Sequence, residues 1–295
     1  MKNQRINYFK IYSPSKLGLF SECPKKYYFF YIDPIYSKMK NELKNKPENI
    51  WHFNTLGKAI HNAITLFYHL PTKERTRDNL LLGLRQTWKS EVIRNKTYPL
   101  GQWGGFHSID EEREYYGDAL SMLKNFFKVS EINPDIYYLP TKEFQNSIED
   151  FHDSIVPLTC DFDIGGKFDL ILEKKGFLHL IDFKTGKGED NDFFQLRFYK
   201  LLTELKFKKK VKEASYYFLR TGNIKTLSFK KEENDKTKEE IITKIKEIRS
   251  AKEFETRPGK LCKFCLFKTF CPEKKEVADI IKDVKKEDYP DDLPF

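Results

Sequence analysis

Residues 166–187 read GKFDLILEKKGFLHLIDFKTGK and contain the clearest structural signal in the sequence. It holds two apolar runs, 168–172 and 177–183, on either side of the polar residues 174–176. Two such runs around a short segment that ends in glycine are typical of a β-hairpin. We therefore expect two adjacent antiparallel strands at the centre of the protein.

The charged residues of this hairpin gather at its open end. If Lys175 and Gly176 form a two-residue turn, pairing of the strands places Asp169 directly opposite Asp182. Side chains alternate along a strand, so Asp182 and Lys184 share one face. The sequence therefore predicts two carboxylates and one ammonium group at one end of strands that are otherwise apolar.

This group of charges has two interpretations. Adjacent carboxylates repel each other, and burial raises their proton affinity. A divalent cation removes the conflict, and hard oxygen ligands favour Mg²⁺ or Mn²⁺. Lys184 would then orient or deprotonate a water molecule beside the metal. The alternative is a salt-bridged hairpin in which Lys184 pairs with Asp169 or Asp182, because ion-pair clusters also perturb pKa values.

The composition favours a protein with a polyanionic partner. The 295 residues suffice for one large domain or two small ones, and 39% hydrophobic residues can bury a substantial core. The formal net charge of +9 suits a polyanionic partner, although a lysine-rich composition alone is also compatible with a solvated surface. The chain has no apolar run that predicts a membrane span and no apolar signal core in residues 1–15, so we expect a cytoplasmic protein. It also lacks a GxxxxGK[ST] motif, which argues against an ATP-driven motor.

Three helices are predicted in the first half of the chain, at Leu56–Leu70, Asp78–Arg94 and Asp110–Val129. In the first helix, Gly57 and His61 are four residues apart and share one face. Glycine at that position permits close approach of another backbone. An isolated histidine such as His61 is by default a core or surface residue.

The remaining chain alternates strands, helices and loops. Residues 33–49 are polar and rich in lysine, which predicts a loop. Further elements are expected as strands at 142–148 and 155–162, a hairpin at 214–229, and helices at 191–206 and 235–249. Glu143 is a further candidate carboxylate, although a solvent-facing residue is the alternative. In the helix that follows the central hairpin, Gln195 and Tyr199 are four residues apart and share one face.

The five cysteines are unevenly placed. Cys262, Cys265 and Cys271 form CxxCxxxxxC near the C-terminus, and Cys23 precedes a proline near the N-terminus. A cytosolic chain is not expected to carry a disulfide framework. Four thiolates can hold either Zn²⁺ or an iron–sulfur cluster, and the spacing does not distinguish them. Cys160 ends an apolar stretch and is interpreted as a small buried core residue.

Taken in order, these motifs resemble the PD-(D/E)XK nuclease superfamily, specifically its RecB-type branch with an iron–sulfur cluster. That branch includes CRISPR-associated nucleases and the nuclease domains of recombination helicase–nucleases. The resemblance extends from Ser13 to about Pro272. Its elements are SPS…L…CP from Ser13 to Pro24, GxxxH from Gly57 to His61, GxxD from Gly166 to Asp169, DxKTG from Asp182 to Gly186, QxxxY from Gln195 to Tyr199, and the three closing cysteines. Each motif alone is common, whereas six in this order are specific.

The resemblance implies an α/β fold with a restriction-endonuclease-like core, in which helices flank a central mixed sheet. The nuclease domain would cover residues 1–277, with a helical insertion at about 71–130. An iron–sulfur staple would join the N- and C-terminal parts through elements at 13–31 and 258–272.

The resemblance also implies a role for each motif residue. The metal, Mg²⁺ or Mn²⁺, would be held by His61, Asp169, Asp182 and the backbone carbonyl of Phe183. Lys184 would position the attacking water, and Gln195 and Tyr199 would orient Lys184 and the substrate. The expected catalytic set is thus Asp169, Asp182, Lys184, Gln195 and Tyr199. Phosphodiester hydrolysis needs metal polarisation of the phosphate and charge neutralisation, and both one and two metals are compatible with this set.

The resemblance further implies that Cys23, Cys262, Cys265 and Cys271 hold a [4Fe–4S] cluster with a structural role. Such a site closes a very long loop, so its removal should release much chain entropy. The neighbouring basic and aromatic stretches at 25–31 and 263–270 have two interpretations. They either contact single-stranded nucleic acid by charge and stacking or pack around the cluster.

Residues 278–295 lose apolar periodicity and are predicted to form a disordered acidic tail. The tail ends in Asp291, Asp292, Leu293, Pro294 and Phe295. This end resembles the acidic tip of bacterial single-stranded-DNA-binding proteins, which is a docking peptide for genome-maintenance enzymes. Docking to the same receptors and a merely solubilising tail are both open.

These observations predict a metal-dependent DNA nuclease, in first place an exonuclease on single-stranded DNA ends in DNA repair, recombination or processing. One alternative is a catalytically silent Fe–S nucleic-acid-binding scaffold protein, against which the intact set of His61, Asp169, Asp182 and Lys184 argues. Another is a CRISPR spacer-acquisition nuclease, for which the helical block makes the chain larger than expected.

Overall fold

The computed structural model describes residues 10–44, 46–94, 103–141, 154–189, 192–230 and 233–285. The strands are β1 (Ile11–Tyr12), β2 (Ile136–Tyr138), β3 (Val156–Pro157), β4 (Asp163–Ile164), β5 (Leu170–Lys174), β6 (Phe177–Lys184), β7 (Val211–Phe218) and β8 (Asn223–Ser228). The α-helices are α1 (Pro14–Glu22), α2 (Pro24–Tyr31), α3 (Tyr36–Lys44), α4 (His52–His69), α5 (Arg77–Arg94), α6 (Ile109–Val129), α8 (Phe194–Phe207), α9 (Glu233–Ser250) and α10 (Lys274–Lys282). Short 3-10 turns are η2 (Pro47–Asn49), η3 (Thr72–Glu74), η4 (Trp103–Gly105), η6 (Lys260–Phe264) and η7 (Lys268–Phe270).

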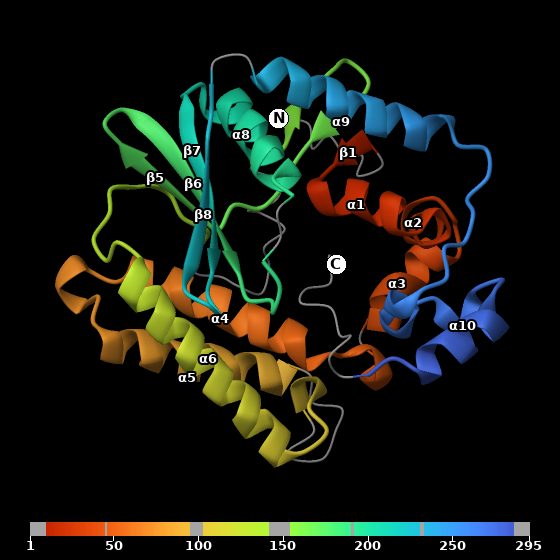
Figure 1. The fold of residues 1–295 in the computed structure, drawn as a ribbon, viewed down its shortest axis with the longest axis horizontal. Helices are drawn as coiled ribbons and strands as arrows, with labels where there is room; N and C mark the ends of the chain where they lie inside the picture. Colours follow the sequence, from red (N-terminus) through yellow and green to blue (C-terminus); the bar gives the residue numbers. More distant parts are fainter. Residues whose placement is uncertain are drawn as a thin grey trace, which may run out of the picture.

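The centre of the protein is a mixed five-stranded sheet of order β2-β5-β6-β7-β8 (Figure 1). Strands β6 and β7 run parallel, whereas the other neighbours in this sheet are antiparallel. The helix α8 crosses from β6 to β7, as a parallel pair requires. A smaller sheet of order β1-β4-β3 carries the chain into the N-terminal helices. The predicted α/β fold with a central mixed sheet flanked by helices is thus confirmed.

The hairpin β5–β6 has the register that the sequence predicts. Lys174 pairs with Phe177, so Lys175 and Gly176 form the two-residue turn. Their φ angles of 51° and 81° are both positive, as a type I′ turn demands. Glycine supplies the second of these angles without steric cost.

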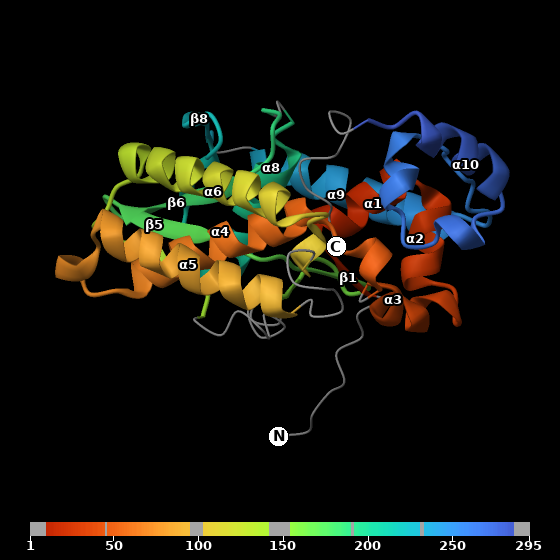
Figure 2. The same cartoon turned by 90° about the horizontal axis from the view of Figure 1, so that it is seen from below.

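Apolar residues on the two faces of the central sheet belong to two separate hydrophobic cores. On one face, Ile181 and Phe183 pack with α4, α5 and α6. On the other face, Leu178 and Leu180 pack with α1, α2, α8 and α9. Figure 2 shows α4–α6 as one continuous layer. The helices expected as an insertion at about 71–130 therefore complete one core of the sheet.

The N-terminal helices contact the C-terminal part of the described chain. In Figure 1 the red and orange helices α1–α3 stand beside the blue helix α10. The backbone N–H of Lys25 donates to the carbonyl oxygen of Glu255 at 3.0 Å. Ser13 caps α1, because its side chain accepts a hydrogen bond from the N–H of Lys16.

Several elements differ from the sequence-based expectation. The loop expected at 33–49 contains helix α3, which buries Leu43 against the core. The strand expected at 155–162 is reduced to β3, because Thr159 Oγ1 accepts from the N–H groups of Asp161 and Phe162 and turns the chain. Cys160, expected in the core, is exposed on this turn.

The beginning of the expected disordered tail is also different. Helix α10 continues through Lys282, and both Val277 and Val284 are buried. The rest of the tail, including residues 291–295, lies outside the described residues, as does the strand expected at 142–148 with Glu143. None of the helices in the described part of the chain is long and apolar enough to cross a membrane.

Candidate active site

The central hairpin brings its two aspartates together. The last ladder pair at the open end is Leu170 with Ile181, and one further step in the same register sets Asp169 opposite Asp182. Asp182 and Lys184 share a strand face, and Lys184 Nζ lies 2.8 Å from Asp182 Oδ2. The predicted convergence of two carboxylates and an ammonium group is therefore present.

Helix α4 delivers His61 to Asp169. The distance from His61 Nδ1 to Asp169 Oδ1 is 3.1 Å, and the N–H of Phe183 donates to Asp169 Oδ2 at 2.8 Å. A Cβ added at Gly57 would lie only 3.3 Å from Thr185 Oγ1. A glycine at this position lets α4 approach the end of β6, which explains the paired glycine and histidine of the motif.

Helix α8 delivers Gln195 to the other carboxylate. Lys184 Nζ donates to Gln195 Oε1 at 2.8 Å, and Gln195 Nε2 donates to Asp182 Oδ1 at 3.0 Å. With the Lys184–Asp182 ion pair, these contacts close a triangle of three side chains. Asp182 Oδ2 is buried and receives no well-directed hydrogen bond from any described residue, although Lys184 is near.

Tyr199 supports this triangle from one turn further along α8. Gln195 and the backbone of Lys167 both interact with its hydroxyl group. A Cβ added at Gly166 would lie 2.5 Å from Tyr199 Cε1. The glycine of the GxxD motif is thus required by the close approach of this ring.

The two aspartates have opposite pKa shifts. Burial acts to raise the pKa of Asp169, but the charge and hydrogen bond of His61 and the N–H of Phe183 outweigh it and hold this pKa low. Burial raises the pKa of Asp182, and the charge of Asp169 adds to it while Lys184 opposes. The surroundings therefore favour the ionised form of Asp169 and disfavour that of Asp182.

One contact of this site was missed by the sequence-based prediction. Lys184 Nζ lies 4.9 Å from the ring centroid of Tyr216. In the β6–β7 register, Tyr216 pairs with Asp182. Parallel pairing between strands separated by a helix leaves no local pattern in the sequence, so no signal pointed to this tyrosine.

The four expected cluster ligands lie around one cavity. Cys23, Cys262, Cys265 and Cys271 line a single cavity of about 370 Å³. Burial, against the opposing charge of Lys26, raises the pKa of Cys265 to about 11. Burial likewise raises the pKa of Cys262 and of Cys271, and the charge of Cys23 adds to both shifts. The thiols are close enough to interact, and a bound cation would stabilise their thiolates.

The aromatic residues near this cavity pack on one another. Phe29 and Phe30 are buried, with ring centroids 5.3 and 5.2 Å from that of Phe267. Tyr36 continues the cluster, 5.9 Å from Phe267. Of the two interpretations of these stretches, packing around the cysteine site accounts for the buried rings.

Both sites can be compared with what a metal requires. The hairpin site offers imidazole and carboxylate donors, with one carboxylate oxygen poorly hydrogen-bonded, and this donor set fits Mg²⁺ or Mn²⁺. The cavity offers four thiols, which fit a thiophilic metal centre. As placed, however, no group of three or more His, Cys, Asp or Glu side chains within the described ranges is arranged to hold a metal ion. At the hairpin, Asp169 pairs with His61 and Asp182 pairs with Lys184 instead.

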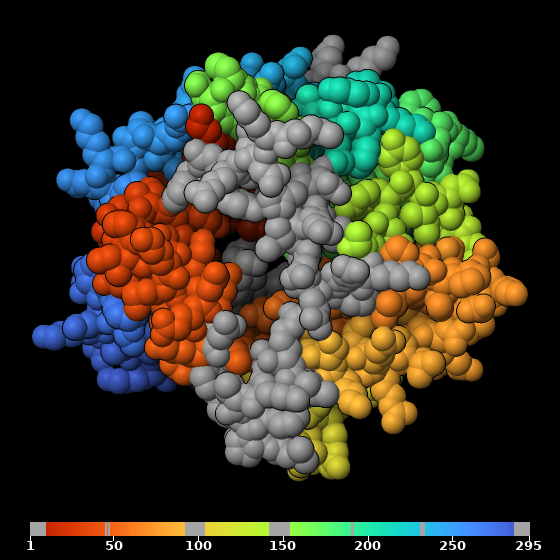
Figure 3. Space-filling model, turned by 180° about the vertical axis from the view of Figure 1, so that it is seen from behind, coloured from red at the N-terminus to blue at the C-terminus, as the bar shows by residue number. Residues whose placement is uncertain are grey.

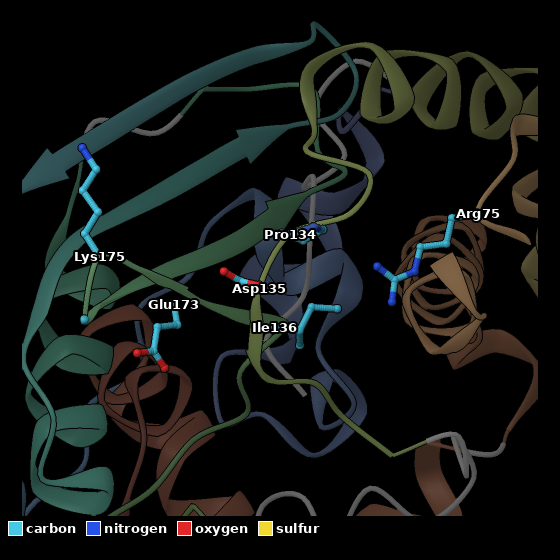
Figure 4. Close-up of a pocket in the computed structure, with 7 residues that line it drawn as sticks. Arg75, Pro134, Asp135, Ile136, Glu173 and Lys175 are labelled. Carbon is cyan, nitrogen blue, oxygen red and sulfur yellow. The ribbon is translucent and has the colours of Figure 1, made fainter. Parts of the chain in front are cut away.

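A second depression lies at the turn end of the same hairpin, away from the aspartates (Figure 4). Its volume is about 490 Å³, and Arg75, Asp135, Glu173 and Lys175 line it among others. Arg75 donates to the carbonyl oxygens of Tyr68 and Leu70, which hold the end of α4. Arg75 therefore stabilises the end of α4, and the depression is separate from the candidate active site.

Comparison with protein families matches residues 11–272 to the PD-(D/E)XK nuclease superfamily. The matched range includes every hairpin, α4 and α8 residue of the candidate site and all four cysteines of the cavity. Comparison with curated proteins gave no match.

Proposed function

The chain belongs to the PD-(D/E)XK nuclease superfamily, whose members are hydrolases acting on nucleic acid, and on this premise we propose that it is a metal-dependent DNA nuclease. The observation that carries the proposal is the hydrogen-bonded triangle of Asp182, Lys184 and Gln195 beside the His61–Asp169 pair. Such a set joins acidic ligands to a positioned ammonium group, which phosphodiester hydrolysis requires.

Each residue of the set has a separate task in this mechanism. His61, Asp169, Asp182 and the carbonyl of Phe183 would hold Mg²⁺ or Mn²⁺. When bound, that cation supplies polarisation of the phosphate and neutralisation of developing charge. Lys184 donates hydrogen bonds that orient the attacking water and stabilise the charge on the phosphoryl oxygens. Gln195 fixes Lys184 by accepting from its ammonium group, and Tyr199 fixes Gln195.

We propose an exonuclease that acts on single-stranded DNA ends during repair, recombination or processing, as in the RecB-type branch that the motifs resemble. The net charge of +9 supports a polyanionic substrate. We also propose that Cys23, Cys262, Cys265 and Cys271 hold a structural [4Fe–4S] cluster. Their shared cavity and the contact between the N- and C-terminal parts support that role.

The partner proposed for the C-terminal tip comes from the sequence alone. A terminal Phe295 can enter an apolar pocket while its carboxylate meets an Arg or Lys, and Asp291 and Asp292 add attraction to a basic surface. The receptors would be those that bind the tip of single-stranded-DNA-binding proteins.

The test is Mn²⁺-dependent cleavage of end-labelled linear and circular single-stranded DNA. We expect cleavage of the linear form only, and a loss of at least about 10²-fold in Asp182→Ala and Lys184→Ala. Asp161→Asn, at an exposed aspartate outside the site, is the matched control and should cleave normally. Cleavage of circular DNA would contradict the exonuclease, and full activity of Asp182→Ala would contradict the assigned site.

A further inference from the structure

Four lysines gather on the N-terminal helices outside the catalytic set. Lys16 comes from α1, Lys40 and Lys44 from α3, and Lys58 from α4. The ammonium groups of Lys16 and Lys40 share one aromatic ring, with Nζ atoms 4.7 and 5.3 Å from the centroid of Tyr31. Three different helices thus contribute lysines to this cluster.

Neutral groups contribute to holding these lysines. Lys16 is only 5% exposed, and its Nζ donates to the carbonyl oxygen of Ile11 at 2.9 Å. Lys40 Nζ donates to the carbonyl oxygen of Phe30 at 3.4 Å, and Lys44 Nζ lies 5.9 Å from the centroid of the Phe30 ring. Carbonyl oxygens and ring faces orient ammonium groups without cancelling their net charge.

The lysines also repel one another. Burial and the charge of Lys40 lower the pKa of Lys16 to about 7. Burial, Lys40 and Lys58 lower the pKa of Lys44 to about 8. Burial and like charge make the ionised forms costly here, and a bound anion would offset that cost.

The lysine cluster leads towards the candidate active site. Lys58 precedes His61 by three residues on α4, so the two side chains are neighbours on the helix surface. Lys58 in turn acts on Lys44 of α3. Figure 3 shows the red and orange surface of the N-terminal helices on one face of the protein.

We propose that Lys40, Lys44 and Lys58, supported by the buried Lys16, bind the phosphate groups of the nucleic-acid strand that enters the Asp169–Asp182 site. The inference rests on the proposed nuclease function and adds the surface that holds the substrate. A strand carries phosphates at regular spacing, so several lysines can be engaged by one ligand, whereas free phosphate engages one point. The protein is therefore expected to bind a strand more tightly than inorganic phosphate, so that phosphate displaces the strand poorly.

The test compares two double variants that remove the same charge. Lys44→Gln/Lys58→Gln removes two lysines of the cluster, and Lys73→Gln/Lys128→Gln removes two exposed lysines at the other end of the helical layer. Anisotropy of a labelled single-stranded oligonucleotide in EDTA measures binding without cleavage across a range of salt. Two single-strand phosphate contacts contribute about 1.4 to the slope of log K against log salt, or roughly ten-fold in affinity at 0.15 M salt relative to 1 M.

We expect the cluster variant to lose that slope and affinity, the remote variant to bind like the unmodified protein, and Lys44→Arg/Lys58→Arg to restore binding. Equal weakening by both Gln variants, or an unchanged slope in the cluster variant, would overturn the inference while leaving the nuclease proposal intact. Equal displacement of the strand by inorganic phosphate at matched phosphate concentration would also overturn it. If the unmodified protein neither bound nor cleaved DNA, the proposed function itself would fail.

Discussion

The substitution Gly166→Ala tests how tightly the GxxD motif is fitted to α8. A Cβ at residue 166 would lie 2.5 Å from Tyr199 Cε1, whereas carbon atoms in contact prefer about 3.5 Å or more. The ring or the chain at Gly166 must therefore move by about 1 Å. The backbone of Gly166 is not in the left-handed region, so alanine also stabilises by about 0.4–1 kcal/mol through the unfolded state. Overpacking costs about 1–3 kcal/mol, and the net result should be destabilisation of about 1–2 kcal/mol.

A double-mutant cycle separates this clash from other effects. Tyr199→Leu removes Cε1, the atom in closest approach, so the double variant should be more stable than the sum of the single changes by about 1 kcal/mol or more. Gly18→Ala is the control, because nothing lies within 4 Å of its added Cβ and it sits exposed in α1. That change should stabilise by about 0.5–1 kcal/mol.

The assays are denaturant unfolding and cleavage of linear single-stranded DNA. Because Tyr199 holds Gln195, Gly166→Ala should lower cleavage as well as stability. The double variant should recover stability without recovering cleavage, since the tyrosine hydroxyl is gone. Additive unfolding free energies in the cycle would refute the predicted contact. Unchanged cleavage by Gly166→Ala would refute the link from this ring to the catalytic triangle.

Three further predictions concern other parts of the chain. Lys16 should contribute unfolding free energy that rises between pH 7 and 10.5, because burial and Lys40 lower its folded-state pKa to about 7 and the folded state loses the proton first. Lys16→Met should therefore reduce the slope of unfolding free energy against pH in this range by up to about 1.4 kcal/mol per pH unit, and equal slopes for the variant and the unmodified protein in denaturant unfolding would contradict this. Cys23→Ser should lower the iron content and reduce the unfolding free energy by up to about 5 kcal/mol, because it opens a loop of about 240 residues. Cys160→Ser, at an exposed cysteine, should change neither quantity much. Stoichiometric zinc without iron in anaerobically purified protein would favour the zinc alternative. Deletion of Phe295 should abolish pull-down by receptors of the single-stranded-DNA-binding protein tip and leave cleavage of naked DNA unchanged; equal recovery by both forms would exclude docking.

The sequence predicted those parts of the site that local rules control. A two-residue turn fixes hairpin register, so the pairing of Asp169 with Asp182 followed from Lys175 and Gly176 alone. Helical spacing likewise put Gln195 and Tyr199 on one face of α8. These rules act within one element or between neighbours in the chain, and they need no knowledge of tertiary contacts.

Contacts between distant segments were beyond those rules. Tyr216 reaches Lys184 only because β6 and β7 pair in parallel across α8. The lysines of α3 were assigned to a loop, since one buried Leu43 and two partly buried neighbours give little apolar periodicity. Cys160 was placed in the core because its apolar neighbours suggested a strand, whereas the side chain of Thr159 turns the chain outward.

The two aspartates of the hairpin are chemically identical in the sequence, and the helices on either side of the sheet make them different. Helix α4 packs on one face and brings the imidazole that holds Asp169 ionised. Helix α8 packs on the other face and brings Gln195, which binds Asp182 and Lys184 but adds no charge. Burial and the neighbouring carboxylate then dominate at Asp182 and raise its pKa. The difference in pKa between the two carboxylates therefore depends on which helix packs beside each of them. A change in the packing of α4 should alter the pKa of Asp169 more than that of Asp182.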